Sequence, residues 1–220
     1  LIGGHPGAGK STLVLQTLCK LSDSQSCLYI TGEESLSQVA MRADRLKLPK
    51  EKLRLAAETD VEQILELARK EMPRVLVVDS IQVMFLAALQ SAPGSVAQVR
   101  ECAAALTRFA KQTGTVLLLV GHVTKDGTLA GPKVLEHMID CSLMLEGSTD
   151  SRFRTLRGLK NRFGAVNELG VFAMTGEGLK EVKNPSAIFL NRADEIASGS
   201  LVTVVWEGTR PLLGELQALV

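Results

Sequence analysis

The residues best suited to chemistry lie near the start of the chain, in the run Gly4-His5-Pro6-Gly7-Ala8-Gly9-Lys10-Ser11. This run fits the pattern G-x-x-x-x-G-K-[ST], in which backbone N–H groups converge on phosphates, the lysine reaches the β- and γ-phosphates and the hydroxyl ligates Mg²⁺. The helical pattern Thr12–Lys20 aims its N-terminus at the same anion. The placement of Lys10 and Ser11 argues against the alternative, a Gly-rich turn that only caps a helix. We therefore expect a nucleoside triphosphate to bind at Gly4, His5, Pro6, Gly7, Ala8, Gly9, Lys10, Ser11 and Thr12.

Acidic residues follow two apolar runs and would complete such a site. Asp79 ends the run Val75–Val78, a position from which an acidic residue holds Mg²⁺ opposite the phosphate loop. An Asp at this place can also cap the next turn, and we favour the metal role, shared with the Ser11 hydroxyl. Glu33 and Glu34 follow a second apolar run, and one of them could orient and deprotonate water at the γ-phosphate. The alternative is two solvated glutamates in the first turn of a helix.

Three histidines are candidates for weaker roles. His122 follows the apolar run Val116–Val120 and precedes the loop Thr124–Lys133. It could sense the γ-phosphate and pass the signal to that loop, or it could be a structural histidine. We interpret His5 as a residue that lines the phosphate loop, and His137 as a packing or surface residue.

The segment Ser151–Arg162 contains basic residues and no acidic one, and these are Arg152, Arg154, Arg157, Lys160 and Arg162. The formal net charge of the chain is only +1, so this segment is a local asymmetry. If it is extended, residues 152, 154, 160 and 162 fall on one face by strand alternation. Such a face suits a nucleic-acid backbone or a phosphate on a neighbouring subunit. A solvated, charged strand is the alternative.

The elements that would position these residues follow from the apolar pattern. Unbroken apolar runs predict buried parallel strands at Cys27–Ile30, Val75–Val78, Val116–Val120 and Cys141–Leu145. Helical patterns lie between them, opened by capping boxes at Ser35 and Thr59, and a long amphipathic helix ends at Gly114. The alternation predicts an α/β fold, a mostly parallel central sheet flanked by helices, with its site beyond the carboxyl ends of the strands.

The second half of the chain reads as β-rich. After about Gly147, strand-like segments occur at Arg152–Lys160, Leu169–Thr175 and Ala187–Leu190. A last piece, Ser200–Trp206 and then Pro211–Val220, follows the polar stretch Asn191–Gly199. We expect one domain over residues 1–190, and a linker with the beginning of a truncated domain over 191–220. Leu1 and Ile2 resemble the end of a strand whose start is missing, so we expect a fragment of a longer protein.

The cysteines indicate the compartment. Cys19, Cys27, Cys102 and Cys141 show no C-x-x-C spacing, which favours reduced core residues over metal ligands and suggests a reducing cytoplasm. No apolar run is long enough to span a bilayer, and no signal peptide is evident.

The phosphate loop, Tyr29–Ser35 and above all the run Lys160-Asn161-Arg162-Phe163-Gly164 resemble the bacterial RadA (also called Sms) family, RecA-like ATPases of recombination and repair. The resemblance covers essentially the whole chain, including Ala92–Val96, Gly131–His137 and Trp206–Pro211. The phosphate loop is shared by many families, whereas the K-N-R-F-G run is far more specific.

The resemblance implies a RecA-like P-loop core that assembles as a hexameric ring on single-stranded DNA. With ATP and Mg²⁺ such a ring extends heteroduplex on branched DNA during branch migration, as a helicase-like motor that works with RecA. It implies that Glu33 is the base with Glu34 in reserve, and that Lys160 and Arg162 act on the nucleotide of the adjacent subunit and couple it to DNA. The loops Ala92–Ser95 and Lys125–Lys133 would face the channel of the ring.

The complete set of expected DNA-binding residues is Lys125, Lys133, Arg152, Arg154, Lys160 and Arg162. The family's four-cysteine zinc module and Lon-protease-like domain have no counterpart within these 220 residues. Two further readings compete: an ATP-gated DNA-binding mediator with little hydrolysis, and a clock-type or kinase-like relative that shares the Glu33-Glu34 pair. The K-N-R-F-G run argues against the second of these.

Overall fold

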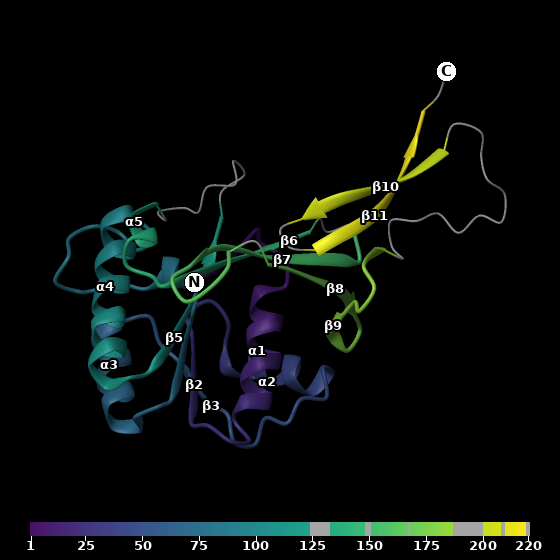
Figure 1. The fold of residues 1–220 in the computed structure, drawn as a ribbon. Coiled ribbons are helices and arrows are strands. Elements are labelled where there is room, and N and C mark those ends of the chain that lie inside the picture. Colours follow the sequence, from purple (N-terminus) through teal and green to yellow (C-terminus); the bar gives the residue numbers. More distant parts are fainter. Residues whose placement is uncertain (124–132, 148–150, 167, 187–199, 208–209, 219–220) are drawn as a thin grey trace.

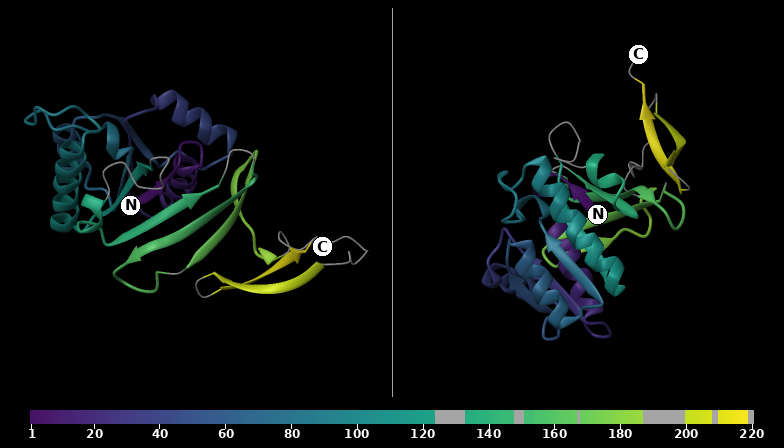
Figure 2. Two further views of the ribbon diagram at one scale, coloured as in Figure 1. Left: turned by 90° about the horizontal axis from the view of Figure 1, so that it is seen from above. Right: turned by 90° about the vertical axis from the view of Figure 1, so that its left-hand side faces the viewer.

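The computed structural model describes residues 1–123, 133–147, 151–166, 168–186, 200–207 and 210–218. Within these ranges, a nine-stranded sheet has the order β3-β2-β4-β5-β1-β6-β7-β8-β9, and helices cover both faces of its parallel part (Figure 1). A separate two-stranded hairpin, β10 and β11, extends away from this sheet (Figure 2). No helix in the described ranges is long and apolar enough to cross a membrane.

The first six strands form the parallel part of the sheet. They are β1 (Ile2–Gly4), β2 (Cys27–Thr31), β3 (Arg54–Ala57), β4 (Val75–Asp79), β5 (Val116–His122) and β6 (Cys141–Glu146). The four strands predicted from apolar runs are confirmed to within two residues at each end. β3 was missed because it is a four-residue edge strand without a fully buried position, and edge strands lack the continuous apolar run of central parallel strands.

The helices pack on both faces of the parallel strands. Apolar side chains of α1 (Lys10–Leu21) and α2 (Leu36–Arg45) join Tyr29 and Val77 in one cluster. On the opposite face, α3 (Val61–Glu71), α4 (Val96–Thr113) and the single turn α5 (Lys133–Glu136) pack on alternate residues of the same strands. This is the doubly covered arrangement expected for a parallel sheet.

The ends of the helices confirm two of the predicted capping residues and contradict a third. Ser35 forms the predicted capping box with Gln38, and Gly114 ends α4 in the left-handed conformation at φ 70°, where glycine is favoured. The cap of α3 is Asp60, which accepts a hydrogen bond from the Glu62 N–H. The prediction of Thr59 as the capping residue was therefore wrong by one position.

The remaining strands of the large sheet are antiparallel. They are β7 (Phe153–Asn161), β8 (Leu169–Thr175) and β9 (Gly178–Glu181). In the β6–β7 pairing, Ser142 lies opposite Lys160 and Leu143 lies opposite Gly158, so Leu159 is an extra residue in a bulge. Such a bulge breaks strict alternation along a strand, and residues on its two sides no longer share a face as the sequence pattern predicted.

The last strands are β10 (Ser200–Glu207) and β11 (Arg210–Gln217), which pair with one another from Ser200–Gln217 to Glu207–Arg210. The predicted strand Ala187–Leu190 lies outside the described residues. The division into residues 1–190 and 191–220 stays a prediction.

Candidate active site

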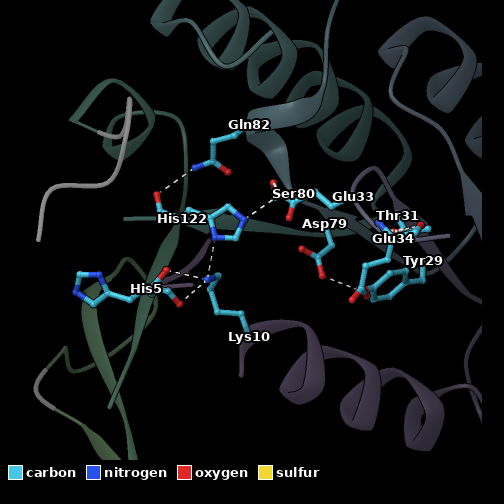
Figure 3. Close-up of polar contacts among 11 residues, drawn as sticks. His5, Lys10, Tyr29, Thr31, Glu33, Glu34, Asp79, Ser80, Gln82 and His122 are labelled. Carbon is cyan, nitrogen blue, oxygen red and sulfur yellow. Dashed lines mark hydrogen bonds and ion pairs between the residues drawn. The ribbon is translucent and has the colours of Figure 1, made fainter. Parts of the chain in front are cut away.

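The candidate site lies where neighbouring strands of the parallel half end. The loop His5–Gly9 follows β1, Glu33 follows β2, Asp79 ends β4, Ser80 comes next, and His122 ends β5. Since β2, β4, β5 and β1 are consecutive neighbours in the sheet, their carboxyl ends bring these side chains to one edge (Figure 3). Ligands of open parallel sheets bind at this edge.

The phosphate loop has glycine where the backbone approaches other groups closely. Gly9 has φ 104° and precedes α1, and a Cβ there would lie 2.6 Å from the Met174 Cε. A Cβ on Gly4 would lie 2.4 Å from the Leu145 carbonyl oxygen, a separation that no side chain can take without moving the backbone. Ala8 is buried, whereas His5 at the tip is exposed. The loop therefore packs against β6 and β8, and His5 is exposed to solvent.

Lys10 is the buried cation of the site. Its ammonium donates to the carbonyl oxygens of Gly4 at 2.7 Å and His5 at 3.0 Å, and it lies 3.2 Å from His122 Nδ1. Burial lowers the pKa of Lys10, and the nearby carboxylates of Asp79 and Glu33 act in the opposite direction. The carbonyl oxygens of Gly4 and His5 hold the Lys10 ammonium beside the loop. Phosphate oxygens, which form stronger charge-assisted hydrogen bonds, could replace them when a nucleotide binds.

The structure connects Glu33 to this cation through His122. Its Oε1 lies 2.9 Å from His122 Nε2 and accepts a hydrogen bond from the Ser80 hydroxyl. Burial raises the pKa of Glu33, but the hydrogen bonds from Ser80 and His122 and the charge of Lys10 outweigh it, so the net pKa is lowered. The carboxylate is thus held ionised, as an acceptor of a proton from water must be.

Glu34 has other partners. Its carboxylate pairs with Arg42, on the second turn of α2, and its backbone exchanges hydrogen bonds with the Thr31 hydroxyl. In Figure 3 the Glu34 side chain lies beside Tyr29, away from Lys10. Of the two neighbouring glutamates, only Glu33 therefore contacts His122 and Ser80.

Asp79 is buried, and its Oδ2 accepts a hydrogen bond of 2.6 Å from the Tyr29 hydroxyl. The Ser11 hydroxyl and the Asp79 carboxylate are both oxygen donors, the kind that Mg²⁺ prefers. The described residues contain no group of three or more His, Cys, Asp or Glu that could hold a metal by themselves. The Ser11 and Asp79 oxygens fit a Mg²⁺ ion, which would take its remaining ligands from a bound nucleotide and water.

Three residues of the site were missed by the sequence analysis. Ser80 donates a hydrogen bond to Glu33, and Tyr29 donates one to Asp79. Gln82 donates to the main-chain oxygen of His122 at 3.1 Å. Ser80 directly follows Asp79, so adjacency was a signal that could have found it. Tyr29 and Gln82 depend on contacts between different strands, and no local pattern marks them.

The expected cationic face is divided by the structure. Arg152 is exposed, with its guanidinium 4.8 Å from the centre of the Phe153 ring. Arg154 is only 5% exposed and donates to the main-chain oxygens of Ala8 at 3.1 Å, of Phe153 at 2.8 Å and of Ser151. The expectation that Arg154 lies on a cationic face with Arg152 was wrong. The Arg154 side chain is buried because its guanidinium donates to Ala8 in the phosphate loop.

The cations at the far end of β7 contact the last residue of α5 and the residues that follow it. Lys160 donates to the Glu136 main-chain oxygen. Arg162 lies 2.8 Å from the Asp140 carboxylate and donates to the His137 main-chain oxygen at 3.2 Å. His137 itself is exposed. Lys125 lies outside the described residues, and Lys133 begins α5 with a side chain that the structure does not describe.

A glycine-rich loop leading into α1, opposite acids at the ends of neighbouring parallel strands, defines a P-loop nucleoside triphosphatase with a RecA-like core. A solved KaiC-like protein of Pyrococcus horikoshii has the same fold, with a TM-score of 0.65 at 18% identity over 82% of this chain and 87% of that chain. A family model described as AAA domain matches residues 1–128, and the chain belongs to this family of ATPases.

The predicted resemblance to RadA is confirmed by full-length similarity of this chain to curated proteins. The DNA repair proteins RadA of Haemophilus influenzae and of Escherichia coli are each 70% identical over 220 residues, which is 100% of this chain and 48% of theirs. The DNA repair protein RadA of Bacillus subtilis is 52% identical over 221 residues, again 100% of this chain and 48% of its own length. The chain spans about half the length of these relatives.

Proposed function

We propose that this chain hydrolyses ATP and couples the hydrolysis to movement on DNA in homologous recombination and repair. The observation that carries the proposal is the continuous contact from Lys10 through His122 to Glu33, with separations of 3.2 and 2.9 Å. It connects the proposed phosphate-binding cation, Lys10, to the proposed base, Glu33, through the proposed sensor, His122. The names of the RadA relatives support DNA repair as the setting.

In the proposed reaction the loop and Lys10 bind the phosphates, and Glu33 orients the attacking water and accepts its proton. Ser11 and Asp79 would hold Mg²⁺, which when bound supplies positive charge for the developing phosphate charge. Lys10 must leave the carbonyl oxygens of Gly4 and His5 to reach phosphate oxygens. This movement alters its contact with His122, and we assign His122 the role of sensor on that basis.

The proposed DNA contacts lie around β7 and the loops that the family resemblance assigns to the channel. They comprise Lys125, Lys133, Arg152, Lys160 and Arg162, without the buried Arg154. Cations of this kind bind the phosphate backbone without reading sequence. We propose single-stranded and branched DNA as substrates, a hexameric ring as the assembly, RecA as a partner and the cytoplasm as the location.

Arg162 and Lys160 have a second proposed role at the nucleotide of an adjacent subunit. Within one chain, the Arg162–Asp140 pair is 46% and 41% exposed at its two side chains. An exposed ion pair of this kind contributes little to stability. Arg162 could therefore leave Asp140 for the phosphate of a neighbouring subunit at a small cost in free energy. A cation supplied in trans can raise hydrolysis by about 10³ to 10⁵.

The test is the rate of ATP hydrolysis with and without single-stranded DNA, measured over a range of chain concentrations. A motor predicts strong stimulation by DNA and a rate per chain that rises with concentration. ATP-dependent DNA binding without such stimulation would instead identify the mediator. The absence of both ATP binding and hydrolysis would refute the proposal.

A further inference from the structure

Tyr29 is the only tyrosine in the chain and one of its most completely buried side chains, at 1% exposure. It lies on β2, where Thr31 pairs with Asp79 and Tyr29 pairs with Val77 of β4. Its ring packs in the apolar cluster that includes Val14 and Leu18 of α1. From there the hydroxyl reaches one Asp79 oxygen, Oδ2, at 2.6 Å.

This contact determines how the Asp79 carboxylate is presented. A hydrogen bond to an ionised carboxylate is among the stronger and more directional contacts in proteins. In Figure 3 the carboxylate lies between Tyr29 and Lys10, with Oδ2 on the Tyr29 side and the other oxygen on the side of Lys10 and His122. Phenylalanine would fill the same apolar space, so packing alone does not explain the hydroxyl.

We propose that Tyr29 is a positioning residue for magnesium-dependent nucleotide binding, because its hydroxyl fixes the orientation in which Asp79 faces the phosphate loop. The inference rests on the proposed ATP site and extends it to a residue that touches neither nucleotide nor metal.

The test is Tyr29→Phe in the 220-residue chain, with the fluorescent nucleotide mant-ADP as the probe. Nucleotide affinity is measured in EDTA and over a Mg²⁺ titration. We expect the Mg²⁺ concentration for half-maximal binding to rise about tenfold, the typical effect of losing one hydrogen bond to a charged group. Affinity in EDTA should stay unchanged, because the loop and Lys10 are intact.

Two further variants separate positioning from a general loss of structure. Thr115→Val removes another buried hydroxyl, which donates to the Pro73 main-chain oxygen at 3.0 Å, and it should leave the Mg²⁺ titration unchanged. In an Asp79→Asn background, Tyr29→Phe should add no further change to the Mg²⁺ dependence. Equal effects of Tyr29→Phe in both backgrounds would overturn the inference.

A measurement on the wild-type chain keeps the inference testable even if the variant does not fold. Because Tyr29 is the only tyrosine, ultraviolet resonance Raman bands of tyrosine report its hydroxyl alone. They should change when Mg²⁺ is added with ADP, and not with ADP in EDTA, and unchanged bands would overturn the inference. Wild-type binding without any Mg²⁺ dependence would overturn both the proposed metal site and this inference. A Mg²⁺-dependent wild type beside an identical Tyr29→Phe variant would overturn only the inference.

Discussion

His122 Nε2 lies 2.9 Å from the Glu33 carboxylate, although the two residues are 89 positions apart. They come from β5 and from the turn after β2, on the two sides of β4 in the sheet. The other ring nitrogen of His122 lies 3.2 Å from Lys10. In the proposed function, a movement of Lys10 toward a phosphate would change its contact with His122, and through the imidazole it would affect the Glu33 carboxylate.

Glu33→Gln should lower kcat by about 10² to 10⁴, the usual contribution of a general base. ATP binding should be retained, because the phosphate loop is unchanged. Glu34→Gln is the matched control, since within the described part of the chain the Glu34 carboxylate pairs with Arg42 and bonds to neither Lys10 nor His122, and it should keep kcat within about threefold of wild type. Steady-state hydrolysis and filter binding of ATP measure the two quantities. A larger loss in Glu34→Gln than in Glu33→Gln would contradict the assignment of the base.

Ser80→Ala should shift the acidic limb of the pH–rate profile to higher pH. The Ser80 hydrogen bond favours the ionised form of Glu33 and helps to lower its pKa. Without this bond the pKa rises, so the base becomes protonated at a higher pH on the acidic side. The midpoint of the acidic limb of kcat is the measurement, with Ser95→Ala, a helix-cap change outside the site, as control. An unmoved midpoint would show that Ser80 does not tune the base.

Lys10→Ala should abolish measurable hydrolysis and weaken ATP binding by about 10² or more, because it removes the charge that faces the phosphates. The overall fold should persist, because the Lys10 ammonium bonds only to Gly4, His5 and His122 among the described residues. Circular dichroism and ATP binding are measured on the same sample. Normal turnover in this variant would reject the phosphate-loop assignment.

Arg162→Ala and Lys160→Ala should each lower ATP hydrolysis at high chain concentration by about 10³, the lower bound for a cation supplied in trans. Nucleotide binding should be retained, because neither side chain contacts the loop of its own chain in the described structure. Arg108→Ala, a change of an exposed arginine on α4, is the control. Rates that are independent of concentration and insensitive to both changes would exclude a shared site.

Arg154→Met should lower stability and ATP binding, whereas Arg152→Met should affect only DNA binding. Arg154→Met leaves the Ala8 main-chain oxygen without its donor, and we expect a loss of about 3 kcal/mol in the free energy of unfolding with weaker ATP binding. Arg152→Met should leave stability unchanged and lower the salt dependence of DNA binding by about one unit of slope. Urea unfolding and DNA binding at several salt concentrations test the pair. Equal stability of the two variants would contradict the structural role of Arg154.

Much of the fold follows from the order of residues alone. The apolar runs around Val75–Val78 and Val116–Val120 predicted strands because a strand buried on both faces must be apolar at every position. The phosphate loop was identified because its glycines, Lys10 and Ser11 are neighbours in the chain. Their spacing alone is what phosphate binding requires. The capping box at Ser35 is equally local.

The antiparallel half shows where local pattern fails. Strand alternation placed Arg152 and Arg154 on one exposed face with Lys160 and Arg162, but one face of β7 supports the phosphate loop. Arg154 is turned to Ala8, a residue 146 positions away. The bulge at Leu159 depends on how β7 pairs with β6. The neighbouring Gly158 is a local sign of a bulge, but it does not show which strand β7 pairs with.

The sequence by itself determined the class of site, because a phosphate loop and strand-ending acids are encoded by neighbouring residues. Only the tertiary structure decided which glutamate faces Lys10, which arginine is buried, and that Tyr29 holds Asp79. These choices depend on the order β2-β4-β5 and on the register between strands. Hydrogen bonds form between groups that the sheet brings within about 3 Å, and separation along the chain does not reveal that distance.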